Sequence, residues 1–112
     1  MGLLLERAGD VTVAVLKAEY LDGNTSRDFN ERLATLPGDA NRLVLDLGQV
    51  LFLDSTGCGA LLSARKRLRG AGGDLKVCSL TSPVRALFDL VRMNRLIGVY
   101  RTRDEAVAAF AP

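Results

Sequence analysis

The chain has 112 residues, of which 48% are hydrophobic and 25% charged, and this composition predicts one globular domain that spans residues 1–112. Its net charge of +2 is too small to indicate a nucleic-acid partner, and no apolar run approaches the ~18–20 residues that cross a bilayer. The absence of histidine excludes Ser-His-Asp catalysis, Cys-His catalysis and imidazole metal sites.

The first two predicted elements are strands that form a hairpin. Leu3–Leu5 is an apolar run, and Val11–Leu16 alternates so that its valines share one face. The small and polar residues Ala8-Gly9-Asp10 between the two runs predict a turn of about three residues. We therefore expect this hairpin to supply an antiparallel edge of the sheet.

A helix and an inner strand follow the hairpin. Turn-forming residues at Leu21–Thr25 lead into a helix that Pro37-Gly38 ends. The apolar positions of this helix recur at helical spacing and are Phe29, Leu33 and Leu36. The apolar run Arg42–Leu47 predicts a buried strand, and a tight connection follows it.

The stretch Asp54-Ser55-Thr56-Gly57-Cys58-Gly59 consists of small or polar residues between two apolar segments. It therefore predicts the connection between a strand and the helix that follows it, with the helix beginning near Thr56. The first N–H groups of a helix lack partners inside the helix, so Asp54, Ser55 and Thr56 are all candidate caps. A hydroxyl at this point would be exposed and would lie at the positive end of the helix dipole.

Helices and strands continue to alternate in the second half of the chain. A glycine cluster ends the preceding helix, and Asp74–Ser79 predicts a strand. Ser82-Pro83 predicts the start of a helix, with a capping hydroxyl and proline at the first helical position. Its predicted buried stripe is Val84, Leu87, Phe88 and Val91. Leu96–Tyr100 predicts a last strand, and Thr102–Glu105 predicts a capping box that opens a last helix.

The resulting order, ββαβαβαβα, predicts an α/β fold. Strands that alternate with helices imply right-handed crossovers and a mostly parallel sheet, to which the opening hairpin adds an antiparallel N-terminal edge. Ligands of open α/β sheets bind beyond the carboxyl ends of the strands, which is where Asp54–Gly59 falls. This stretch is therefore the main candidate for a functional site.

Four interpretations of Asp54–Gly59 stay open on the residues alone. Its hydroxyls could be helix caps only, or its N–H groups could hold a phosphate, although the Gly-Lys-Ser/Thr of a nucleotide loop is missing. Ser55 or Cys58 as a catalytic nucleophile would lack a base. Ser55 could instead accept a phosphate from another protein's ATP, because the chain has no motif that activates ATP. Such a phosphate adds about −1.5 to −2 charges beside Asp54 and would act on binding rather than on the fold.

The runs Leu43–Leu47 and Phe52–Leu62 resemble the signature of STAS domains, in particular of bacterial anti-sigma factor antagonists. The resemblance extends over nearly the whole chain, because Gly72–Cys78 is similar to the Gly-Gly strand of the family and Ser82–Leu90 to the helix that follows it. It implies a STAS-type sheet of four or five strands with about four helices. Two departures from the family pattern are Glu19-Tyr20 in place of Gly-Glu and Cys58 in place of an apolar residue.

The resemblance also implies a binding function without catalytic residues, cofactor or metal. In the family, the unphosphorylated protein binds an anti-sigma factor serine kinase and frees a sigma factor. Phosphorylation of the serine after the aspartate, which is Ser55 here, ends this binding, and a PP2C-type phosphatase resets the cycle. The implied partner-binding residues are Asp22, Asn24, Asp54, Ser55, Thr56 and Gly57. Other STAS domains are constitutive subunits of ABC-type lipid-transport ATPases, which is the alternative function.

The sequence also predicts the surroundings of three further groups of residues. The basic residues Arg65, Lys66, Arg67 and Arg69 are expected to form a solvated helix face. The apolar residues Leu90, Val91, Met93, Leu96 and Ile97 could extend beyond the core as an exposed patch, but core packing is the expected arrangement. A cytoplasmic location without membrane insertion is expected, and it argues against a disulfide between Cys58 and Cys78.

Overall fold

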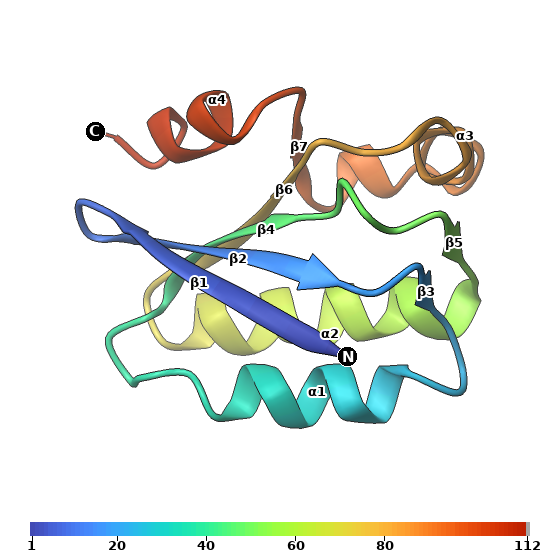
Figure 1. Cartoon of the computed structure of the whole chain (residues 1–112). Helices are drawn as coiled ribbons and strands as arrows, with labels where there is room; N and C mark the ends of the chain where they lie inside the picture. The colour runs from blue at the N-terminus through green and yellow to red at the C-terminus, as the bar shows by residue number, and fades with distance from the viewer. Residues whose placement is uncertain (112) are drawn as a thin grey trace.

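In the computed structural model, which describes residues 1–111, a five-stranded sheet lies between helices on its two faces (Figure 1). The strands in spatial order are β1 (Gly2–Ala8), β2 (Val11–Lys17), β4 (Arg42–Asp46), β6 (Asp74–Cys78) and β7 (Gly98–Tyr100). β1 is antiparallel to β2, and the other neighbours are parallel. The predicted α/β fold with an antiparallel N-terminal edge is therefore confirmed, and Pro112 lies outside the described residues.

The opening hairpin has a tighter turn than the sequence predicts. Ala8 pairs with Val11, so the turn contains two residues, Gly9 and Asp10, and Gly9 adopts the left-handed φ of +64° that glycine tolerates. Both faces of β2 are buried: Val13 belongs to a small apolar cluster under the last helix, and Leu16 belongs to the main core. The strand is mostly apolar because helices cover the sheet on both sides.

The helices form two layers around the sheet. Figure 1 shows α1 (Ser26–Ala34) and α2 (Ser55–Gly70) on one face and α4 (Arg103–Ala108) on the other. α3 (Ser82–Val91) is followed by the 3-10 turn η1 (Met93–Arg95) and packs against the short strand β5 (Phe52–Leu53). None of these helices is long and apolar enough to cross a membrane, within the residues that the structure describes.

Two helix boundaries differ from the sequence-based expectation. α1 ends at Ala34, so Leu36 lies beyond the helix, where it is partly buried against the core. The N-cap of α3 is Thr81 rather than Ser82, which moves Pro83 from the first to the second helical position. The hydroxyl of Thr81 donates to the carbonyl of Val50 at 2.6 Å instead of capping its own helix.

The predicted capping box at the start of α4 is half formed. The Thr102 hydroxyl accepts a hydrogen bond from the N–H of Glu105 at 3.1 Å, as a capping box requires. The Glu105 carboxylate accepts from the N–H of Arg101 at 3.3 Å rather than from that of Thr102. The helix start is therefore capped, although the return bond goes one residue further back.

The structure contains a second, small sheet that was not predicted from the sequence. β3 (Tyr20–Leu21) and β5 (Phe52–Leu53) pair in parallel, and the carbonyl of Glu19 accepts hydrogen bonds from Leu51 N at 2.7 Å and Phe52 N at 3.0 Å. Strands of two residues are too short to give a periodic signal. This pair brings the start of α1 beside the start of α2.

Core packing of the segment that follows Phe88 is confirmed for Met93 and Ile97 and wrong for the other three residues. Leu90 is 79% exposed, and Val91 and Leu96 are each 49% exposed. α3 ends where Arg92 adopts a left-handed φ of +59°, and η1 then turns Met93 and Ile97 inward. The neighbouring apolar side chains are consequently left outside, including Val91 of the predicted buried stripe.

The basic end of α2 is only partly a solvated face. Lys66 and Arg67 are exposed, as predicted. Arg65 is half-buried and contacts the Asp74 carboxylate at 3.1 Å, and Arg69 reaches the same carboxylate at 3.7 Å. This end of the helix is therefore tied to β6 by charge.

Candidate functional site

Ser55 is the first residue of α2, and its side chain is exposed. The preceding residue, Asp54, is the N-cap, and its Oδ1 accepts a hydrogen bond from the N–H of Gly57 at 2.8 Å. Of the three candidate caps, Asp54 therefore fills this role, and the hydroxyls of Ser55 and Thr56 are left free for other contacts. Within residues 1–111, the N–H groups of Ser55 and Thr56 have no hydrogen-bond acceptor.

The second oxygen of the Asp54 carboxylate connects α2 to the loop before α1. It accepts a hydrogen bond from the N–H of Gly23 at 3.2 Å. That loop is itself fixed, because Asp22 Oδ1 accepts from Asn24 N at 3.0 Å and from Thr25 N at 3.2 Å. The Thr25 hydroxyl in turn accepts from Asp22 N at 3.0 Å. One carboxylate thus holds two loops in a defined relation beside Ser55.

Gly57 is buried where the start of α2 crosses the end of β3. A Cβ atom on Gly57 would lie 2.1 Å from the Leu21 carbonyl oxygen and 2.6 Å from Leu53 Cδ1. Only a residue without a side chain allows these two backbone segments to pack so closely. Gly59 differs, because a Cβ there would meet nothing within 4 Å. Gly57 therefore positions Ser55 but offers no side chain to a partner.

An apolar rim lies next to the hydroxyls of the site. The rings of Tyr20 and Phe52 are 6.0 Å apart across the small sheet and are 54% and 48% exposed. Leu51, beside them, is 51% exposed. Sequence reasoning missed this rim, because it forms only when Tyr20-Leu21 pairs in register with Phe52-Leu53.

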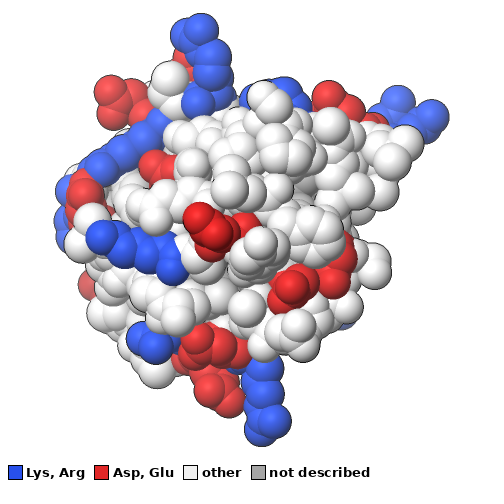
Figure 2. All heavy atoms as spheres, turned by 45° about the vertical axis from the view of Figure 1, so that its right-hand side comes forward, with Lys and Arg blue, Asp and Glu red and all other residues white. Residues whose placement is uncertain are grey.

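The charge around the site is negative and uncompensated. Neither Asp22 nor Asp54 makes a salt bridge in the part of the chain that the structure describes. Figure 2 shows the side of the molecule that carries the small sheet, where uncharged atoms form a broad area with a few acidic groups, and most basic side chains lie at the margin. Neither carboxylate is therefore neutralised by an ion pair within residues 1–111, and a negative charge added at Ser55 would join them.

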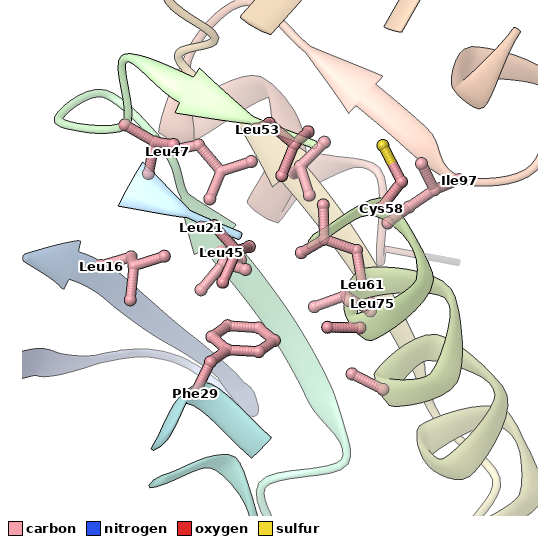
Figure 3. Close-up of a cluster of buried hydrophobic side chains, with 14 of the residues drawn as sticks. Leu16, Leu21, Phe29, Leu45, Leu47, Leu53, Cys58, Leu61, Leu75 and Ile97 are labelled. Carbon is pink, nitrogen blue, oxygen red and sulfur yellow. The ribbon is translucent and has the colours of Figure 1, made fainter. Parts of the chain in front are cut away.

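Cys58 points away from the site into the core. Figure 3 shows its sulfur among apolar side chains that include Leu61 and Ile97, and 8% of the residue is exposed. Burial, and secondarily the charge of Asp54, raise the pKa of the Cys58 thiol above its ordinary value. Both Cys58 and Cys78 are free thiols. A buried thiol with a raised pKa is a poor nucleophile, which disfavours catalysis at this residue.

The predicted site residues converge in space. Gly23 links the Asp22 loop to Asp54 by a hydrogen bond, and a Cβ atom on Gly23 would lie 4.0 Å from Thr56 Oγ1. Asn24 is exposed on the same loop, and only its backbone N–H has a described partner there. Chemically, the arrangement presents an exposed hydroxyl on a rigid helix start that can accept a group from outside. A role of these residues in binding a partner stays a prediction.

Comparison with known proteins identifies the kind of domain. The STAS domain family model matches residues 3–106. The Bordetella bronchiseptica protein BtrV, named as an anti-sigma factor antagonist, is 29% identical over 98% of this chain and 95% of its own length. A crystal structure of an anti-sigma factor antagonist from Mycobacterium paratuberculosis superimposes with a TM-score of 0.84 at 24% identity, covering 99% of this chain and 94% of that one. The phosphorylated form of SpoIIAA from Bacillus matches with a TM-score of 0.66 at 19% identity, over 96% and 98% of the two chains.

Proposed function

The chain belongs to the STAS domain family, and from this premise we propose that it acts as an anti-sigma factor antagonist, a regulatory binding protein rather than an enzyme. The relatives that carry this name, one of them aligned over almost the full length of both chains, support the proposal. We expect the protein to work in the cytoplasm, where sigma factors and their antagonists meet.

The proposed mechanism is a switch at Ser55. The unphosphorylated chain binds an anti-sigma factor serine kinase, which then releases its sigma factor. The kinase transfers the γ-phosphoryl group of ATP to the Ser55 oxygen, the hydroxyl proton leaves, and ADP is the leaving group. A PP2C-type phosphatase hydrolyses the phosphate and restores binding. The observation that carries this proposal is the exposed Ser55 hydroxyl on the first turn of α2, held by the Asp54 cap.

The electrostatics of the site explain why phosphorylation would change binding without changing the fold. A phosphoserine adds about −1.5 to −2 charges at pH 7. The N-terminus of a helix tolerates this charge, because its free N–H groups and its dipole favour anions. At the surface, however, the phosphate joins Asp54 and Asp22, which have no cationic partner in residues 1–111. A partner that fits the uncharged hydroxyl would therefore meet repulsion and a desolvation cost.

Phosphate transfer gives a direct test of this proposal. The purified chain is incubated with ATP and candidate anti-sigma kinases of the histidine-kinase-like fold, and mass spectrometry locates the added phosphate. We expect stoichiometric modification of Ser55, loss of modification in Ser55→Ala and normal modification in the matched control Ser63→Ala, which replaces an exposed serine further along α2.

Two results would contradict the switch. One is phosphate on a residue other than Ser55. The other is a stable complex with an ABC-type transporter ATPase together with no modification by any kinase, which would favour the constitutive subunit.

A further inference from the structure

Large apolar side chains are exposed mainly in one part of the molecule. The described residues include eight such side chains, and six of them belong to the small sheet, to the end of α3 and to the segment after η1. These six, which we call the apolar patch, are Tyr20, Leu51, Phe52, Leu90, Val91 and Leu96. The remaining two, Leu4 and Leu5, lie on the outer strand β1. A concentration of exposed apolar surface of this kind marks an interaction site.

The elements that carry the apolar patch pack against one another. α3 contacts β5, and the Thr81 hydroxyl at the start of α3 is bonded to the Val50 carbonyl just before β5. The Tyr20 and Phe52 rings are in contact range across the small sheet. The broad uncharged area in Figure 2 lies on this side of the molecule.

The outward position of the helix residues is built into the backbone. Phe88, Met93 and Ile97 anchor the segment, since each is 2% exposed or less. The left-handed residue Arg92 reverses the chain between these anchors, and Leu90 is left 79% exposed. Leu90 therefore contributes little to the core, and it is exposed together with its neighbours Val91 and Leu96.

We propose that the apolar patch is the part of the binding surface that provides most of the affinity for the anti-sigma kinase. The phosphorylation state of Ser55 then controls whether the kinase can bind. This inference rests on the proposed function. The occupant is an apolar surface of the kinase itself, because the small-sheet part of the patch adjoins the Ser55 site: Phe52 lies two residues before the cap Asp54, and α3 packs against the strand that contains Phe52. A second copy of this chain seated on the same patch would cover Ser55 and keep the kinase away from it.

The two parts of the surface should respond differently to salt. Burial of apolar side chains is insensitive to ionic strength, whereas repulsion around a phosphate weakens as salt screens it. We therefore expect a loss of affinity caused by the apolar patch to persist at high salt, and to arise from faster dissociation. The loss caused by a charge at Ser55 should shrink under the same conditions.

Serine substitutions at Leu90 and Leu96 test the inference. Affinity is measured against the anti-sigma kinase that phosphorylates the wild-type chain, with Leu4→Ser as the matched control on β1. Leu90→Ser should weaken binding about tenfold, as expected for a residue that anchors an interface. Leu90→Ser/Leu96→Ser should weaken it further, with an unchanged circular dichroism spectrum, and Leu4→Ser should bind as the wild type does. Leu90 is so exposed that its replacement should leave the fold intact.

The outcomes separate this inference from the proposed function. Wild-type affinity of Leu90→Ser for a kinase that still phosphorylates Ser55 would overturn the inference alone. A wild-type dimer in sedimentation experiments that Leu90→Ser dissociates would also overturn it, because the occupant would then be a second copy. If no kinase modifies Ser55, the proposed function fails and the inference fails with it.

Discussion

An aspartate lies beside each end of α2, and the two carboxylates have different kinds of partner. Asp74, beside the C-terminal end, faces three cations: Arg65 at 3.1 Å, and Arg69 and Lys76 at 3.7 Å. Asp54, at the N-terminal end, binds only backbone N–H groups among residues 1–111, those of Gly57 and Gly23. The negative charge at Asp74 is therefore neutralised by side chains, and that at Asp54 is held by peptide dipoles alone.

This difference is consistent with a structural role for the C-terminal end of α2 and with the binding role that we propose for its N-terminal end. The charge cluster at Asp74 ties α2 to β6 and leaves no exposed hydroxyl for modification beside the carboxylate. At Asp54 the connection is made through backbone N–H groups, and Ser55 beside it is exposed. Under the proposed function, a phosphate on Ser55 would therefore lie on the surface that the partner contacts.

The largest expected effect comes from a substitution at Gly57 that disrupts the packing of the N-terminal end of α2. Gly57→Ala forces a Cβ to within 2.1 Å of the Leu21 carbonyl, so the start of α2 and the end of β3 must separate. We expect a loss of about 3 kcal/mol or more in the free energy of unfolding, measured by urea denaturation. The matched control Gly59→Ala has open space and should be neutral or stabilising by about 0.5–1 kcal/mol. Equal stability of the two variants would contradict this packing.

Alanine substitution of Asp74 and of Asp54 should lower the stability with different salt dependence. Asp74→Ala removes the carboxylate that lies 3.1 Å from Arg65 Nε and should cost about 1 kcal/mol, less in high salt. Asp54→Ala removes an N-cap and should cost about 1 kcal/mol with little salt dependence.

The two aspartate variants should also differ in function. Urea denaturation at two ionic strengths measures their stability, and kinase affinity is measured in parallel. Asp54→Ala should weaken kinase binding, whereas Asp74→Ala should not. Asp54→Asn is the control for Asp54→Ala, because asparagine also caps helices. A larger salt effect on Asp54→Ala than on Asp74→Ala would contradict the assignment of the two roles.

The smallest effect concerns the Cys58 thiol behind the site. Burial and the Asp54 charge raise its pKa, so less thiolate is present at a given pH than in the unfolded chain. In a Cys78→Ser background, iodoacetamide should modify Cys58 more slowly in the folded than in the denatured protein at neutral pH, with the rate rising at alkaline pH. Asp54→Asn should lower the pKa and increase this rate slightly. Rapid modification of the folded protein at pH 7 would show that the thiol is not protected.

The fold and the centre of the site were predictable because several local signals agreed. The valines of β2, the glycines after α2 and the proline at the start of α3 each indicate an element through its own backbone preferences, and together they specify the alternation of strands and helices. The run Asp54–Gly59 combines a strong cap with a following helix, which places Ser55 at a helix start.

Other features depend on tertiary contacts that no local pattern encodes. The pairing of β3 with β5 joins residues about thirty positions apart through two-residue strands. The helical spacing of Val91 predicts burial, but the left-handed turn at Arg92 ends the helix before that face meets the core. The clustering of Arg65 with Asp74 likewise requires α2 and β6 to lie side by side.

The most direct test of the account is the affinity of the anti-sigma kinase for the chain before and after phosphorylation of Ser55. We predict that phosphorylation, and to a smaller extent Ser55→Asp, weakens binding at least about tenfold, or about 1.4 kcal/mol, at physiological salt. Ser55→Ala should bind as the unmodified chain does, and all of these forms should unfold at similar temperatures. Equal affinities of the phosphorylated and unphosphorylated chains would contradict the account.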